Sequence, residues 1–306
     1  MSFTRVSFPS FNLEVVGNLY TPESSATSRN GAAIVIAHPM TGVKEQTASD
    51  YARVLSAAGF YALVYDAAYQ GESSGLPRGL EDPHQRIEDI KAAVTFLSTR
   101  VPAIDPQRIG VVGICASGGY SSYAAQSDSR IRALATVSAA CVGHMTRHGG
   151  VHKGQSESAM AVADALKIAG QWRVDHPVAE KDAEEAPKIF DACNLPEDAD
   201  AFFKDGSQYY GTKRGLHERC TQRVPPSSYD LMVSYDSFAF QRLIAPRPLL
   251  MVAGENAHTL HYSEDAVANA QGDKELFVVK GKNHFDLYDD LSESGPKIVG
   301  FFVKDL

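Results

Sequence analysis

The sequence has only four cysteines among 306 residues, and they lie far apart at Cys115, Cys141, Cys193 and Cys220. They form no CxxC pair and no disulfide framework. This usage is typical of a reducing compartment, where a thiol stays free to act as a nucleophile. We therefore expect a cytoplasmic protein.

Long apolar runs and an excess of basic residues are also absent. No stretch reaches the ~20 apolar residues that a membrane-spanning helix needs, and residues 1–16 lack the apolar core of a signal peptide. The 29 Lys and Arg residues are outnumbered by 37 Asp and Glu residues, for a formal net charge of −8. A nucleic-acid-binding protein usually shows a basic face. We therefore expect neither a membrane nor a nucleic-acid partner.

Apolar residues make up 44% of the chain, enough for a globular core without disulfides or metal. Residues 4–22 alternate apolar and polar side chains, which predicts an antiparallel hairpin. Later in the chain, short apolar runs rich in β-branched residues predict strands buried on both faces of a parallel sheet. These predicted strands are residues 32–37, 61–65, 109–114, 133–137, 249–252 and 275–279.

Helical patterns lie between these strands, at residues 46–59, 84–100 and 294–306. Strands that alternate with helices imply right-handed βαβ units. The sequence thus predicts an α/β fold with a doubly wound, mostly parallel sheet.

The alternation stops between residues 141 and 246, where the content is helical and polar. The last strands follow this stretch, so the predicted core is discontinuous, comprising residues 1–140 and 247–306. A long insertion into an α/β sheet is more often a lid over the site than a loose loop. We interpret residues 141–246 as a helical cap.

The stretch "GICASGGY", residues 113–120, follows a predicted strand and can begin a helix. In a sharp strand-to-helix turn the nucleophile sits between small residues two positions away on each side. Gly113 and Ser117 meet that requirement around Cys115. The N-terminus of the following helix favours a thiolate, which predicts a lowered thiol pKa. Ser117, flanked by Cys115 and Gly119, is the alternative nucleophile.

A nucleophile needs a base within hydrogen-bond reach, and in hydrolases of this chain order the base follows the last strand. His284 occupies that position, after residues 275–279 and a short turn. A carboxylate is expected after the preceding strand, but the usual position, three residues past Gly254, is Ala257. We choose Glu255 as the acid, over Glu264 and Asp265.

Acyl transfer places negative charge on a carbonyl oxygen, which backbone N–H groups must stabilise. We expect these donors from Ala116, after the nucleophile, and Met40, after the strand 32–37, with Thr41 as the alternative to Met40. Thr41 is also predicted to bind substrate. Tyr69, in the turn after the strand 61–65, is predicted to face the substrate or simply to pack.

His144, His148 and His152 recur at four-residue spacing, which on one helix aligns three imidazoles. Gly149 and Gly150 interrupt such a helix, and no carboxylate is close in sequence. We therefore expect no metal and no cofactor.

Several motifs together resemble the α/β-hydrolase superfamily, and more narrowly its dienelactone-hydrolase-like and polyketide-transferase-like group. They are "HPMTGVKEQ", "YDAAYQGESSG", "GICASGGY", "AGENAHT" and "NHFDLYD". The superfamily nucleophile is usually serine, and a cysteine in the elbow is similar to dienelactone hydrolase. The resemblance implies cleavage of esters, lactones or thioesters, or transfer of acyl groups to acceptors.

The leading hypothesis is an acyl hydrolase that acts through Cys115, His284 and Glu255 on a small-molecule acyl substrate. An acyltransferase that passes a polyketide-type acyl group to an alcohol or amine is the second hypothesis. A hydrolase-like binding protein without catalysis is the third, since Ala257 replaces the usual acid. The sequence leaves the oligomeric state open, and a homodimer is compatible with it.

Overall fold

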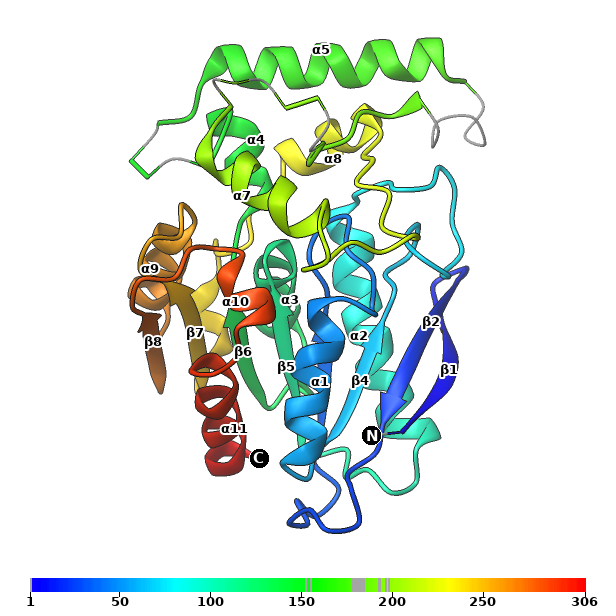
Figure 1. The fold of residues 1–306 in the computed structure, drawn as a ribbon, viewed down its shortest axis with the longest axis vertical. Coiled ribbons are helices and arrows are strands. Elements are labelled where there is room, and N and C mark those ends of the chain that lie inside the picture. The colour runs from blue at the N-terminus through cyan, green and yellow to red at the C-terminus, as the bar shows by residue number, and fades with distance from the viewer. Residues whose placement is uncertain are drawn as a thin grey trace.

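The computed structural model describes residues 2–151, 153–154, 156–177, 185–191, 194–195, 197 and 199–306. Eight strands form one sheet in the order β1-β2-β4-β3-β5-β6-β7-β8, as Figure 1 shows. The strands are β1 (Phe3–Ser10), β2 (Leu13–Tyr20), β3 (Ala33–Ala37), β4 (Tyr61–Tyr65), β5 (Ile109–Ile114), β6 (Ala133–Val137), β7 (Leu249–Gly254) and β8 (Lys274–Val279).

Strands β1 and β2 form the predicted hairpin, and β2 also pairs antiparallel with β4. The remaining strand pairs are parallel. Every residue of β3, β5, β6 and β7 is buried, because helices cover both faces of the sheet. The prediction of a doubly wound, mostly parallel sheet is confirmed.

Two apolar clusters hold these helices on the sheet. One cluster joins one face to α2 (Pro83–Arg100), α3 (Ala116–Ser127) and α9 (Leu260–Asn269). The other joins the opposite face to α1 (Thr47–Ala57), α10 (Asp286–Asp289) and α11 (Ser294–Asp305). In Figure 1, α1 and α11 lie on the viewer's side.

Between β6 and β7 the described residues form helices and no element of the main sheet. We call residues 141–246 the cap segment. Its elements are α4 (Val142–His148), α5 (Ala159–Asp175), α7 (Ala201–Tyr210), the 3₁₀ turn η1 (Pro226–Ser228), α8 (Tyr229–Val233) and the 3₁₀ turn η2 (Gln241–Ile244). Within the cap segment, residues 178–184 and 192–193 lie outside the described residues.

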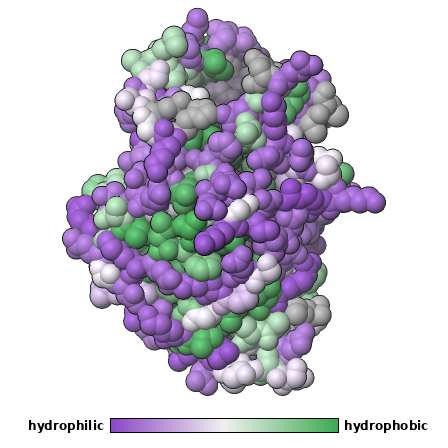
Figure 2. Space-filling view, turned by 60° about the vertical axis from the view of Figure 1, so that its left-hand side comes forward, coloured by the Kyte–Doolittle hydropathy of each residue, from purple (hydrophilic) through white to green (hydrophobic). Residues whose placement is uncertain are grey.

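Most of the cap segment forms a narrower lobe above the broader core, as Figure 2 shows, and α5 crosses the top of this lobe in Figure 1, whereas η2 packs against α3 of the core. In the part of the chain that the structure describes, no helix combines the length and apolar character needed to cross a bilayer. The upper lobe lies over the end of the sheet at which β5 leads into α3.

Candidate active site

The turn between β5 and α3 has the sharp geometry that its sequence predicts. Cys115 adopts φ 58° and ψ −124°, a conformation that costs free energy for a residue with a side chain. A Cβ atom on Gly113 would lie 2.2 Å from the carbonyl oxygen of Ser117. Glycine at position 113 is therefore what allows the elbow to close with Cys115 at its tip.

Ser117, the alternative nucleophile, lies in the first turn of α3 and is 1% exposed. Its hydroxyl donates a hydrogen bond of 2.6 Å to the carbonyl oxygen of His38 and accepts one of 2.9 Å from Arg86. Its side chain is thus held in a buried network. Cys115 lines the apolar cavity above the sheet and Ser117 does not, so the geometry favours Cys115.

His284 does not contact the Cys115 sulfur directly. Nε2 of His284 lies 2.9 Å from the hydroxyl of Tyr288, and that hydroxyl lies beside the thiol of Cys115 and interacts with it. Nδ1 lies 2.6 Å from Oγ1 of Thr259. The expected direct cysteine–histidine contact is therefore replaced by a chain from Cys115 through Tyr288 to His284 and Thr259.

Burial keeps both ends of this chain uncharged. It raises the pKa of the Cys115 thiol, although hydrogen bonds from Tyr288 and the Ala116 N–H act in the opposite direction. Burial, with a smaller contribution from the charge of His258, lowers the pKa of His284 to about 3. The predicted lowering of the thiol pKa is therefore wrong, because desolvation outweighs the helix N-terminus. The resting site holds a thiol and a neutral imidazole.

Phe202 is one of the aromatic rings that cover His284. It extends from α7 of the cap segment and packs its ring edge-on against His284, with ring centroids 5.2 Å apart. His284 is only 1% exposed and does not line the cavity, whereas Tyr288 does. Tyr288 therefore brings the chain of hydrogen bonds to the cavity surface.

Glu255 is not the partner of His284. Its backbone N–H donates to the carbonyl oxygen of Val279, which continues the β7–β8 pairing. Its exposed carboxylate accepts a hydrogen bond of 2.9 Å from the N–H of Gly281. Among the described residues, no carboxylate hydrogen-bonds to His284. We correct the third member of the site from Glu255 to the hydroxyl of Thr259.

The two residues expected to supply the oxyanion donors lie at the same cavity as the nucleophile. Met40 and Ala116 both line the cavity beside Cys115. Thr41 does not line it: its hydroxyl donates to Gln222 over 2.8 Å. Tyr69 is half-buried in its turn, with its ring against Gly75 and away from the cavity lining. Neither Thr41 nor Tyr69 thus lines the cavity at Cys115, and the position of Tyr69 fits the alternative that it packs in its turn.

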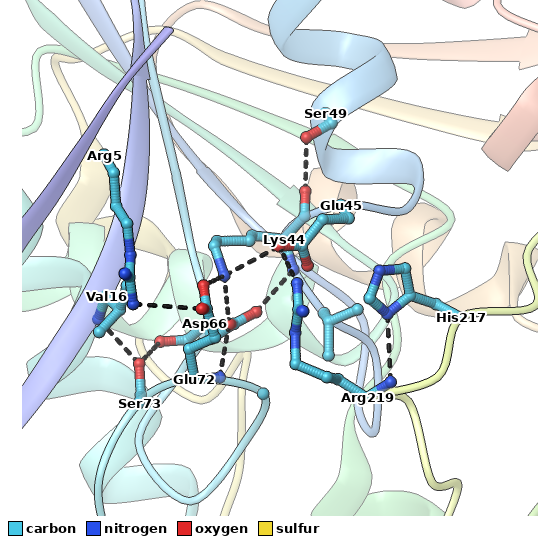
Figure 3. Close-up of polar contacts among 12 residues, drawn as sticks. Arg5, Val16, Lys44, Glu45, Ser49, Asp66, Glu72, Ser73, His217 and Arg219 are labelled. Atoms are coloured by element: carbon cyan, nitrogen blue, oxygen red, sulfur yellow. Dashed lines mark hydrogen bonds and ion pairs between the residues drawn. The ribbon is translucent and has the colours of Figure 1, made fainter.

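The loop that carries Met40 is fixed by buried charges. Lys44 is 1% exposed, and its Nζ lies 2.6 Å from carboxylate oxygens of both Asp66 and Glu72. Figure 3 shows these three side chains pointing toward one another, and Arg219 of the cap segment approaching Glu45. The core and the cap segment thus hold this loop from both sides.

The cavity at Cys115 has a volume of about 340 Å³ and is mostly apolar, and we call it the inner cavity. Met145, Phe202 and Phe203 of the cap segment form part of its wall, and Phe285 and Tyr288 of the core complete it. Lys188 is the one charged side chain among the described residues that line it. The inner cavity therefore suits an apolar group bound next to the thiol.

The profile of the Dienelactone hydrolase family matches residues 15–190 of this chain. The chain belongs to that family. It is 35% identical over 317 residues to the uncharacterized protein YcjY of Escherichia coli (strain K12), covering 100% of this chain and 98% of that one. As a member of this family it is an α/β-hydrolase enzyme with a hydrolytic or acyl-transfer activity, which sets aside the hypothesis of a non-catalytic binding protein.

Other family relatives agree on the fold and vary in the reaction. The crystal structure of the hypothetical protein PA2218 from Pseudomonas aeruginosa has a TM-score of 0.89 and 32% identity, covering 100% of this chain and 94% of that one. The thiohydrolase aneE of Aspergillus aculeatus (strain ATCC 16872 / CBS 172.66 / WB 5094) is 38% identical over 137 residues, which cover 44% of this chain and 41% of aneE.

The histidine-rich stretch of this family member is part of α4 and the turn after it. His152 lies outside the described residues. Within them, the donor atoms of Cys141, His144 and Asp236 lie within 4.8 Å of one another. Nε2 of His144 is 3.1 Å from Asp236, and the Cys141 sulfur accepts a hydrogen bond from the Ser237 N–H. The group satisfies its own hydrogen bonds, and the expectation of no metal stays a prediction.

Sequence reasoning missed Tyr288 and Thr259. Tyr288 follows His284 by four residues, a spacing that places two side chains on the same face of a helical turn. That spacing was the available signal. Thr259 lies 25 residues before His284, and only the packing of α9 beside β8 brings the two together.

Proposed function

We propose that this protein is an acyl hydrolase in which Cys115 is the nucleophile and His284 is the base, acting through Tyr288. The observation that carries the proposal is the strained elbow at Cys115, whose thiol meets the Tyr288 hydroxyl at the wall of an apolar cavity. This hydroxyl in turn contacts Nε2 of His284. The arrangement joins a nucleophile to a base through one intervening group.

In the first step the Cys115 thiol gives its proton to the Tyr288 oxygen, and Tyr288 gives its own proton to Nε2 of His284. The sulfur forms a bond to the substrate carbonyl carbon, and the electron pair of the C=O bond moves to the oxygen. The N–H groups of Met40 and Ala116 stabilise that oxygen. In the tautomer that this mechanism uses, Nδ1 carries the proton and donates it to Oγ1 of Thr259, which lies 2.6 Å away, so that Nε2 is free to accept.

In the second step the bond from carbon to the leaving group breaks. The leaving group takes the proton back from His284 by way of Tyr288, and an acyl group remains on Cys115. Water then attacks the acyl carbon and passes one proton to the same chain. The sulfur leaves and is reprotonated, so the enzyme returns to its starting state.

The substrate class follows from this chemistry and from the cavity. A neutral thiol with a weak base favours acyl groups that have good leaving groups, such as lactones, aryl esters and thioesters. An apolar wall around Cys115 favours an apolar acyl group. The proposed substrate is thus a small-molecule activated ester or thioester, and the proposal requires no cofactor.

Acyl transfer is the second candidate. The relatives claH, a polyketide transferase of Penicillium crustosum, and drtE, an acyltransferase of Aspergillus calidoustus, are 34% and 29% identical over 137 and 138 residues. These matches cover under half of each relative. In this reaction an alcohol or amine, rather than water, attacks the acyl–cysteine. The cap segment would favour that outcome by limiting the access of water.

The test is a panel of aryl esters, lactones and acyl thioesters, each assayed with and without an added alcohol or amine. Wild type, Cys115→Ala, Cys115→Ser and the matched elbow control Ser117→Ala are compared. We expect Cys115→Ala to be inactive and Ser117→Ala to retain activity. Ester or amide product with an acceptor present would favour acyl transfer. Activity that survives Cys115→Ala and is lost in Ser117→Ala would overturn the proposal.

A further inference from the structure

A second cavity adjoins the inner cavity inside the cap segment. It has a volume of about 420 Å³, and we call it the outer cavity. Five residues line both cavities: Met40, Val142, Met145, Phe203 and Tyr229. The two cavities therefore share one wall, and this wall is made of side chains rather than of backbone sheet. Met145 is an unbranched side chain with three rotatable bonds, so it can move aside for a ligand.

The outer cavity lies against the side of α5. Four residues of this helix line it, namely Ala161, Asp164, Ala165 and Ile168, and the two alanines leave the space open. Helix α5 stands across the top of the cap segment in Figure 1, and α4 and α8 pack against it. The cavity is thus a feature of the cap segment itself and not an extension of the sheet.

The chemistry of the outer cavity points to an uncharged, flexible ligand. Its polar side chains are few among the residues described. The hydroxyl of Thr146 is already used, because it donates to the carbonyl oxygen of Val142 over 2.8 Å. Asp164 is exposed on α5 and is the one charged residue among the described residues of the lining. The described lining of the outer cavity therefore offers apolar contact and holds no Lys or Arg that could bind a phosphate or carboxylate head group.

We propose that the outer cavity binds the distal part of the substrate's acyl chain. In this arrangement the carbonyl carbon sits at Cys115, the first part of the chain fills the inner cavity, and the remainder passes Met145 and Phe203. The proposal rests on the acyl-hydrolase function above and adds the substrate class. The substrates are esters or thioesters of medium-length or longer aliphatic acids. Ala165 and Ala161 then determine how long a chain is accepted.

The proposal predicts that transition-state binding becomes stronger as the acyl chain becomes longer. Each methylene group buried in an apolar cavity contributes ~0.8 kcal/mol, which is about a fourfold increase in kcat/KM. We expect this increase to continue past the chain length that the inner cavity holds, and then to level off. If the inner cavity alone bound the acyl chain, kcat/KM would stop increasing at short chains.

The experiment measures kcat/KM for a series of p-nitrophenyl esters and acyl-N-acetylcysteamine thioesters from acetyl to tetradecanoyl. The variants Ala165→Trp and Ala161→Phe fill the outer cavity. The matched control is Ala163→Trp, on the exposed side of the same helix and in neither cavity lining. We expect Ala165→Trp and Ala161→Phe to lose roughly tenfold or more on long chains, with acetyl substrates hydrolysed as by wild type. Ala163→Trp should keep the full chain-length profile.

Two outcomes overturn the proposal. One is a profile that levels off at short chains in wild type, and the other is the same profile in Ala165→Trp, Ala161→Phe and Ala163→Trp. A wild type that acts on no acyl substrate would reject the proposed function itself. In that case displacement of a fluorescent fatty acid by dodecanoate still tests the cavity. Displacement by dodecanoate that occurs in wild type and Ala163→Trp but not in Ala165→Trp supports the outer cavity as the binding site. If dodecanoate does not bind wild type, the proposal is rejected.

Discussion

The hydroxyl of Tyr288 lies 2.9 Å from Nε2 of His284 and also contacts the Cys115 thiol. A phenol in this position is an unusual link between a nucleophile and its base. Burial raises the pKa of Tyr288 well above its ordinary value, so the hydroxyl keeps its proton and is able to accept one proton while donating another. The link therefore depends on the hydroxyl and not on the ring.

Removing that hydroxyl tests the link. Tyr288→Phe should lower kcat by about 10²–10⁴-fold, because proton transfer from the thiol loses its route to His284. KM should change little, since the ring still fills the cavity wall. Tyr123→Phe, on the half-buried surface of α3, is the control and should leave kcat unchanged. A wild-type kcat in Tyr288→Phe would show that His284 reaches the thiol directly.

Thr259, rather than Glu255, should support the histidine. Thr259→Val removes the acceptor 2.6 Å from Nδ1, and we expect kcat to fall by about tenfold. Glu255→Gln should keep the kcat of wild type, because its carboxylate contacts the N–H of Gly281. The pH profile of kcat should shift in Thr259→Val and not in Glu255→Gln. The reverse pattern in the two variants would restore Glu255 as the acid.

The lowered pKa of His284 makes the fold sensitive to acid. Its ordinary value is 6.5 and its folded value is about 3, so the unfolded chain binds a proton in this interval and the folded chain does not. The contribution of neutral His284 to the free energy of unfolding is thus fully present above about pH 6.5 and is lost as the pH drops toward the folded pKa. Between about pH 6.5 and pH 5, His284 alone should cost the fold ~1.5 kcal/mol.

Urea unfolding at these two pH values, in wild type and His284→Gln, measures that loss. Between pH 6.5 and pH 5, the variant should lose ~1.5 kcal/mol less of its free energy of unfolding than wild type does. The buried His38, whose pKa burial also lowers, acts in the same direction in both proteins and so cancels from the comparison. An equal loss in both proteins would mean that His284 is protonated as easily in the folded state as in the unfolded state.

Lys44 should matter more for stability than any exposed ion pair. Lys44→Met leaves the fully buried carboxylate of Asp66 without its cation, which should lower the free energy of unfolding by about 3–5 kcal/mol. Arg5 pairs with Glu72 of the same network, but its side chain is 63% exposed. Arg5→Met should therefore cost less than ~1 kcal/mol. Equal losses in chemical denaturation would contradict the buried role of Lys44.

The backbone of the site could be predicted from the sequence because its signals are local. Continuous apolar runs marked the buried parallel strands. Gly113 marked the elbow, since a side chain there collides with the next turn. Met40 and Ala116 could be placed at the same cavity because they follow the ends of the neighbouring parallel strands β3 and β5.

The side-chain partners could not be predicted in the same way. Glu255 was chosen because it directly follows β7, but its side chain contacts the N–H of Gly281 and not His284. The contact of Thr41 with Gln222 joins residues 181 positions apart. The thiol pKa depended on burial under the cap segment, which no local pattern reports. Long-range packing thus determined the chemistry of the site.

The most direct test of the account is intact-protein mass spectrometry after rapid mixing with a decanoyl thioester. Wild type should carry one decanoyl group, and peptide mapping should place it on Cys115. Ser117→Ala should form the same adduct, Tyr288→Phe should form it more slowly, and Cys115→Ala should form none. An adduct on Ser117, or turnover of the thioester by Cys115→Ala, would contradict the central claim that the Cys115 sulfur carries the acyl group.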